Sequence, residues 1–134
     1  MPSRQEVFDK VQNCLVQALG VKPLDVVPEA ALVDDLGAES IDFVDIIYRL
    51  EKSFDIKIPR GELFPQDLLR NPAYVNAGRL TAVGAEELGK RLDFTAITPI
   101  EPGQEVEKVL GKLFTVGLII DFVLSKCSQA ATNC

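Results

Sequence analysis

The sequence predicts an all-α fold, a small helical bundle, and two observations carry that prediction. Apolar residues recur at steps of three and four along several stretches, which is the spacing of an amphipathic helix. No stretch shows the sustained alternation of apolar and polar residues that predicts a β-strand. A length of 134 residues is that of one ordinary domain with its own core, so we expect a single domain over residues 1–134.

The first helix is predicted over residues 4–19. Ser3 and Glu6 form the pattern of a capping box, in which a hydroxyl and a carboxylate serve the first free N–H groups of a helix. Val7, Val11 and Leu15 follow at helical spacing, and Gly20 ends the segment. Cys14 lies within this apolar stripe and is expected in the core, because no acid–base partner is available to activate its thiol.

A second helix is predicted from Ser40 to Phe54, after a long connection over residues 20–39 that contains two prolines. The pattern places four apolar residues on one side of this helix, and four more widen that side. The first four are Ile41, Val44, Ile47 and Tyr48, and the others are Phe43, Ile46, Leu50 and Phe54. Pro59 prevents the helix from continuing.

The segment 60–103 is rich in Gly and Pro and holds one predicted helix, from Thr81 to Leu92. Its apolar residues are numerous enough to pack on the bundle, so we expect the segment to be partly structured. These residues are Leu63, Phe64, Leu68, Leu69, Tyr74, Leu80, Leu88 and Leu92.

A short helix is predicted over residues 104–112, and a last one, capped by Thr115, runs through Ser125. Residues 128–134 are expected to form a disordered tail.

Composition excludes several classes of function. The chain has no His and only three Cys at no metal-like spacing, so neither a metal site nor a self-contained catalytic site is predicted, and the protein is not expected to be an enzyme. A formal charge of −6 argues against nucleic acid as a partner. The most apolar stretch, residues 113–124, is shorter than the ~20 residues of a membrane span. With no apolar leader at its start, the chain is expected in the cytoplasm.

The whole charge imbalance lies in residues 25–58, which hold nine acidic and three basic residues. Asp42 and Asp45 suit the positive end of the second helix, but Glu39, Asp42 and Asp45 are also close enough on one face to repel one another. Local physics leaves two interpretations open, a patch that binds a partner and an over-acidic solvated face.

The segment around Ser40 resembles the modification site of acyl carrier proteins, in which an acidic loop, Leu-Gly, a small residue and Asp-Ser-Leu open the second helix. Here the segment reads Asp34-Asp35-Leu36-Gly37-Ala38-Glu39-Ser40-Ile41-Asp42, with Glu39 and Ile41 in place of the usual Asp and Leu. The resemblance continues through residues 43–59 and resumes at residues 112–117. Residues 60–103 then stand as an insertion between the second helix and the short third one.

The resemblance implies an acyl-carrier-like four-helix bundle with an extra, partly helical insertion. Ser40 would receive 4′-phosphopantetheine from coenzyme A through a phosphopantetheinyl transferase, and the arm would carry acyl groups as thioesters for fatty-acid, polyketide or related biosynthesis. Ketosynthase or acyltransferase-type enzymes with basic docking patches would be the other partners of this monomer. The expected partner-binding residues are Asp35, Glu39, Ile41, Asp42, Asp45 and Glu51.

Three alternatives remain at this point. A peptidyl or aminoacyl carrier usually shows Gly-Gly-His-Ser or Gly-Gly-Asp-Ser before the second helix, which Ala38-Glu39 fits less well. An unmodified helical adaptor could bind basic partners through the same acidic face. An enzyme acting alone would need a nucleophile with a base, and Cys127 and Cys134, near the end of the chain, offer no such pair.

Overall fold

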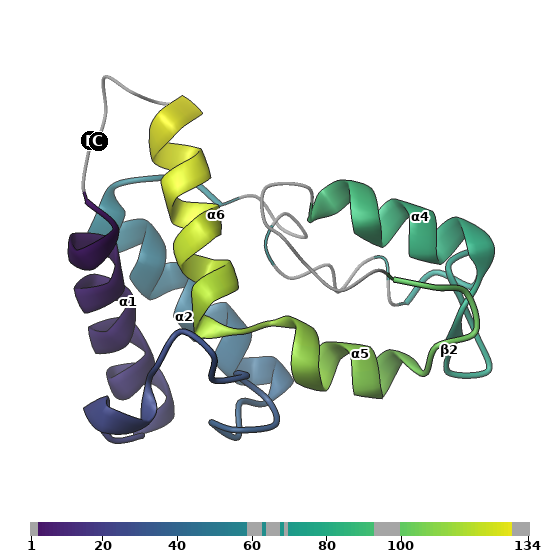
Figure 1. Cartoon of the computed structure of the whole chain (residues 1–134), viewed down its shortest axis with the longest axis horizontal. Coiled ribbons are helices and arrows are strands. Elements are labelled where there is room, and N and C mark those ends of the chain that lie inside the picture. Colours follow the sequence, from purple (N-terminus) through teal and green to yellow (C-terminus); the bar gives the residue numbers. More distant parts are fainter. Residues whose placement is uncertain (1–2, 59–62, 64–67, 69, 93–99, 130–134) are drawn as a thin grey trace.

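The computed structural model describes residues 3–58, 63, 68, 70–92 and 100–129. Within these residues the fold is mainly helical, as predicted, and a small hairpin interrupts the order of the helices (Figure 1). In chain order the elements are α1 (Arg4–Leu19), the 3-10 turn η1 (Pro23–Asp25), α2 (Ser40–Phe54), β1 (Val75–Asn76), β2 (Arg79–Leu80), α4 (Ala82–Arg91), α5 (Val106–Leu113) and α6 (Val116–Gln129).

Three hydroxyl side chains begin helices where the sequence placed helix starts. Ser3 Oγ accepts the Glu6 N–H of α1 at 3.2 Å, and Thr81 Oγ1 accepts the Gly84 N–H of α4 at 3.0 Å. Thr115 Oγ1 accepts the Leu118 N–H of α6 at 3.1 Å. These contacts satisfy N–H groups that have no partner within the helix, so the predicted starts of α1, α4 and α6 are confirmed.

The last helix is longer than the sequence indicated. It continues to Gln129, so Ser128 and Gln129, which were expected in the tail, are helical. Residues 130–134 lie outside the described part of the chain.

The core joins the bundle and the insertion. Helices α1, α2 and α6 pack together, with fully buried residues such as Val11, Leu50 and Ile119 between them. Described apolar residues of the insertion belong to the same buried cluster, so the expectation that the insertion packs on the bundle is met for them. They are Leu63, Leu68, Leu80, Leu88 and Leu92, with Tyr74 partly buried against them, whereas Phe64 and Leu69 lie outside the described residues.

The hairpin is a feature that the sequence did not predict. Val75 pairs with Leu80 and Asn76 with Arg79 across a two-residue turn. Both turn residues have positive φ, 53° at Ala77 and 77° at Gly78, as tight hairpin turns require. The usual signal for such a turn is Asn-Gly or Asp-Gly, and the Ala in the first position hid it.

Backbone hydrogen bonds tie this hairpin to the start of α5. The Leu80 N–H donates to the Gln104 carbonyl at 2.9 Å, and the Gly103 N–H donates back to the Leu80 carbonyl at 2.7 Å. The Val106 N–H donates to the Gly78 carbonyl at 2.9 Å. The insertion is therefore attached to the bundle through the element that follows it, which Figure 1 shows as α4 and β2 lying beside α5.

Candidate functional site

The loop before α2 is folded by hydrogen bonds within itself. The Leu36 N–H donates to the Ala31 carbonyl at 3.1 Å, and the Ala38 N–H donates to the Leu32 carbonyl at 2.8 Å. Gly37 has a φ of 73°, in the left-handed region where a side chain is unfavourable. The apolar residues of the loop are buried, so the chain reaches Ser40 along a fixed path.

Asp35 closes this loop from its side chain. Its carboxylate accepts the Ala31 N–H at 2.7 Å, and Ala31 is only 5% exposed. The neighbouring Asp34 is exposed and makes no side-chain contact of this kind. Of two adjacent acids in the motif, one therefore supports the backbone and the other faces solvent.

The same loop is held to the segment between α5 and α6. The Leu32 N–H donates to the Phe114 carbonyl at 2.8 Å, and the Val116 N–H donates to the Ala30 carbonyl at 2.9 Å. At Gly111 the two segments approach so closely that a Cβ atom would overlap the side chain of Asp34. The loop before Ser40 is thus fixed from two sides, by its own turns and by the last third of the chain.

Ser40 is the first residue of α2, and Glu39 takes the capping position before it. Taken without the family resemblance, the sequence made Ser40 itself the cap. The cap lies one residue earlier because Glu39 is extended, with φ −111° and ψ 169°, and its N–H donates to the Asp42 carboxylate at 2.8 Å. Glu39 and Ile41 are both exposed, so the backbone at Ser40 lies at an exposed start of a helix.

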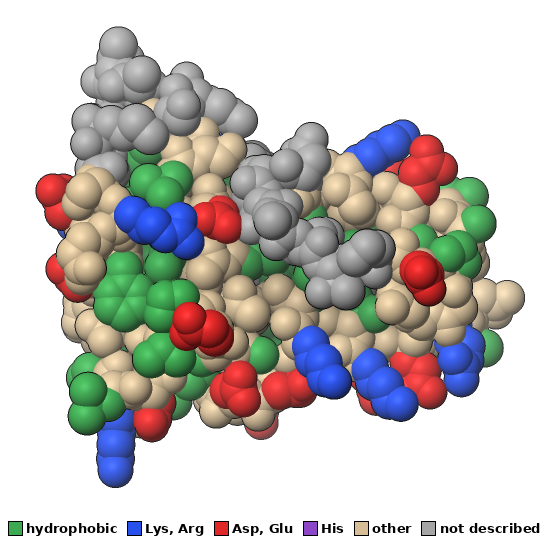
Figure 2. Space-filling view, in the orientation of Figure 1, with side chains coloured by type: hydrophobic (Ala, Val, Ile, Leu, Met, Phe, Trp, Pro, Cys, Tyr) green, Lys and Arg blue, Asp and Glu red, His purple; other side chains and the backbone are tan. Residues whose placement is uncertain are grey.

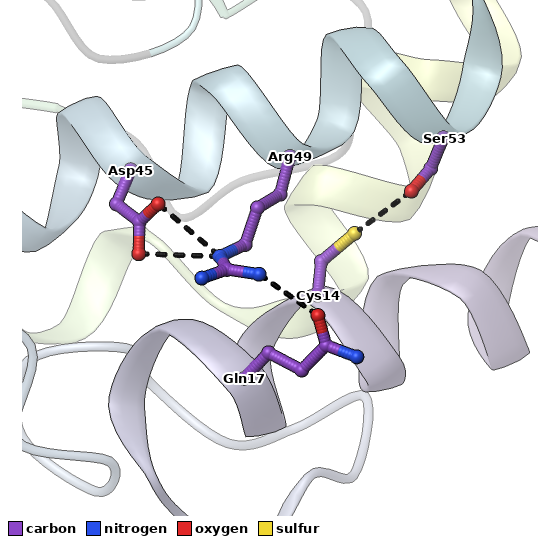
Figure 3. Close-up of polar contacts among 5 residues, drawn as sticks. All are labelled: Cys14, Gln17, Asp45, Arg49 and Ser53. Atoms are coloured by element: carbon purple, nitrogen blue, oxygen red, sulfur yellow. Dashed lines mark hydrogen bonds and ion pairs between the residues drawn. The ribbon is translucent and has the colours of Figure 1, made fainter.

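Asp45 and Arg49 form an ion pair on α2, with Nε of Arg49 at 3.2 Å from Oδ1 of Asp45. Nη1 of Arg49 also donates to Oε1 of Gln17 on α1 at 2.8 Å, so the guanidinium links the two helices (Figure 3). Further along α2, the Glu51 carboxylate accepts the Ile58 N–H at 2.9 Å and holds the chain after the helix.

The six expected partner-binding residues therefore fall into two groups. Asp35, Asp42 and Glu51 accept backbone N–H groups, and Asp45 is paired with Arg49. Glu39 and Ile41 are exposed on either side of Ser40. The structure brings these two next to the expected attachment residue and gives the four other carboxylates contacts within the protein.

The apolar residues of α2 also divide differently from the sequence pattern. Ile46, Leu50 and Phe54 are buried. Ile41, Val44 and Tyr48 are 76%, 66% and 57% exposed, although the pattern grouped them with the others on one side. Sequence reasoning therefore missed Val44 and Tyr48 as surface residues, because apolar spacing marks two neighbouring faces of α2 and does not say which one is covered.

Cys14 is buried against α2, as expected of a core residue. Its Sγ lies 3.4 Å from the Ser53 hydroxyl (Figure 3). Burial raises the pKa of the Cys14 thiol, although the hydrogen bond with Ser53 and the charge of Arg49 act in the opposite direction. A raised pKa disfavours the thiolate, which is the nucleophilic form of cysteine.

Other kinds of site were sought among the described residues. None of them groups three or more His, Cys, Asp or Glu side chains in a way that could hold a metal ion. No described helix is both long enough and apolar enough to cross a membrane.

Comparison with known proteins agrees with the position of this site. Residues 9–69 match a family model described as a phosphopantetheine attachment site, and this range contains α2 and the loop before it. Over 63 residues the chain is 43% identical to the acyl carrier protein of Thermotoga maritima. That alignment covers 47% of this chain and 78% of the relative.

Proposed function

Because the chain belongs to the acyl carrier protein family, a family of carriers and not of enzymes, we propose that Ser40 bears the 4′-phosphopantetheine arm on which it carries acyl groups. The observation that supports this site is the place of Ser40 at an exposed helix start, after a loop that is fixed on two sides. When bound, the arm supplies a terminal thiol that holds acyl groups as thioesters.

The residues of this chain position Ser40 and leave its activation to the transferase. As the arm is attached, the serine oxygen forms a phosphodiester bond, and the bond to the adenosine-containing part of coenzyme A breaks. The serine proton must go to a base of the transferase, because this chain contains no His. The fixed loop presents the same backbone to every enzyme that acts here.

The acidic residues then have two different tasks. Glu39 and Ile41, exposed beside Ser40, are proposed to contact the enzymes that attach and use the arm. Asp35 and Asp42 hold the loop and the helix start, and their remaining lone pairs add to the negative field around Ser40. Rim charges of this kind act mainly on the rate at which a basic partner associates.

The acyl groups are proposed to go to fatty-acid, polyketide or related biosynthetic enzymes of the ketosynthase or acyltransferase type. An unmodified adaptor that binds through its acidic face is less well supported, because most of the acidic side chains on α2 already have contacts within the protein.

The test is attachment of the arm in solution. Incubation with coenzyme A and a broad-specificity phosphopantetheinyl transferase should add one arm to the wild-type protein, seen by intact-mass spectrometry, and none to Ser40→Ala. Circular dichroism should show that Ser40→Ala stays folded, so the lost loading is not a folding defect. A wild-type protein that several such transferases leave unmodified would contradict the proposal.

A further inference from the structure

The outer face of α2 carries an apolar stripe, which we define as Ile41, Val44 and Tyr48. The three residues follow at steps of three and four, so they are neighbours on one side of the helix. Each is more than half exposed, on a helix whose other face supplies Ile46 and Leu50 to the core. Single exposed apolar residues are ordinary, but three in a row beside a proposed attachment site indicate a surface that a partner covers.

The charge along this stripe changes from one end to the other. Glu39 is exposed at the end near Ser40, whereas Lys52 is exposed one turn beyond Tyr48. The ammonium of Lys52 lies 5.5 Å from the centre of the Tyr48 ring and makes no ion pair with any described residue. The cation–π contact keeps this positive charge beside the stripe.

The acidic side chains of α2 do not cancel this positive charge. Asp45 is paired with Arg49, and the Glu51 carboxylate accepts the Ile58 N–H. The second half of the outer face therefore presents an apolar surface that ends in a cation. At a rise of 1.5 Å per residue, Ile41 and Lys52 are about 16 Å apart along the helix.

We propose that α2 docks on the enzymes that use the arm through a surface of two polarities. A basic rim of the partner faces Glu39, an apolar hollow receives the stripe, and an acidic side chain of the partner faces Lys52. This inference rests on the proposed function, since the arm on Ser40 is what places a partner at this end of α2. The occupant is a protein, because a single cation on a chain of net charge −6 suits neither an anionic membrane nor nucleic acid.

Binding of the arm-bearing protein to purified ketosynthases of known structure tests the proposal. The ketosynthases are sorted beforehand by whether an acidic or a basic side chain lies about 16 Å from the mouth of the arm tunnel, along the expected path of α2. Dissociation constants are measured for wild type, Lys52→Glu and Lys57→Glu. Lys57 is an equally charged control, exposed in the segment after α2.

Lys52→Glu should weaken binding about 10-fold to the ketosynthases with an acidic side chain and should improve binding to those with a basic one. Lys57→Glu should change both by less than about 2-fold. Equal dissociation constants for wild type and Lys52→Glu in the acidic group would overturn the proposal, as would an equal loss in Lys57→Glu.

The apolar part has its own matched pair of variants. Val44→Ala should weaken binding about 5-fold or more, because two buried methyl groups are lost from the interface. Val83→Ala on α4, where the valine is similarly exposed at 55%, should leave binding unchanged. Equal effects of the two variants would contradict the role of the stripe.

The mass of each protein before binding separates the two proposals. A wild-type protein that gains no arm contradicts the proposed function itself. A wild-type protein that gains the arm, with Lys52→Glu indistinguishable from it in binding, contradicts only the docking inference.

Discussion

The acidic region, residues 25–58, and the ion-pair region, residues 79–108, use their charges in different ways. In the acidic region three carboxylates accept backbone N–H groups, and one ion pair joins Asp45 to Arg49. In the ion-pair region the charged side chains pair mainly with one another. Those pairs are Arg79–Glu105, Lys108–Glu105, Lys90–Glu86 and Arg91–Glu87.

The difference shows in where the carboxylates lie. Figure 2 shows Lys and Arg side chains gathered along α5 and β2 with Asp and Glu side chains between them, at the surface of the molecule. The carboxylates of the acidic region instead reach the backbone around Ser40 and after α2. An excess of negative charge therefore need not mean unused charge, because part of it fixes the loop that presents the attachment residue.

The largest difference in stability is expected from Asp35→Ala. The Ala31 N–H, in a residue that is 5% exposed, would lose its side-chain acceptor, and an unsatisfied buried N–H costs about 1–3 kcal/mol. Urea unfolding measures this loss of unfolding free energy. Asp34→Ala is the matched control, since it removes the same charge from an exposed neighbour and should cost less than about 0.5 kcal/mol. Equal losses would show that charge, and not the hydrogen bond, is what matters.

A smaller effect is expected from Asp42→Ala. The Glu39 N–H loses its acceptor at the start of α2, which should cost about 0.5–1 kcal/mol in unfolding free energy. Asp42→Asn keeps a carbonyl acceptor and should lose less than the alanine variant does. Thermal unfolding of both variants compares them, and an Asn variant as unstable as Ala would mean that the charge on the helix end dominates.

In the ion-pair region, Glu105→Ala removes two ion pairs at once but should cost less than about 1 kcal/mol. Arg79 and Lys108 are both exposed, and exposed pairs gain little over hydration. The cost should shrink further between about 0.1 M and 1 M salt, because salt screens exposed charges. A loss as large as that of Asp35→Ala would break the contrast between the two regions.

The smallest effect is expected from Glu86→Gln on α4. It removes the pair with Lys90, four residues along an exposed helix face, which is worth about 0.2–0.5 kcal/mol. Unfolding in urea at low salt is the sensitive measurement. A loss above about 1 kcal/mol would show that this pair does more than its exposure suggests.

The helices of the bundle were predictable because their signals are local. Ser3, Thr81 and Thr115 mark helix starts by their own side chains, and Gly20 marks a helix end by its left-handed conformation, with φ 70°. Repeats of three and four residues supplied the rest, so the bounds of α1 and α2 agree with the structure.

What escaped the sequence depends on contacts between distant segments. Nothing local to Asp35 says that its carboxylate will reach the Ala31 N–H, while Asp34 beside it faces solvent. The exposure of Val44 and Tyr48 was equally hidden, because a stripe that awaits a partner has the same apolar spacing as one that is already buried.

The central claim, that Ser40 carries the arm, is tested most directly by locating the arm on a peptide of the loaded protein. Trypsin should release residues 11–49 as one peptide, because Lys22 is followed by Pro23 and is not cleaved. Ser40 is the only Ser or Thr in that peptide. The account predicts that tandem mass spectrometry finds the arm on this peptide, at Ser40. An arm found instead on a peptide that contains another serine, such as Ser53 or Ser125, would contradict it.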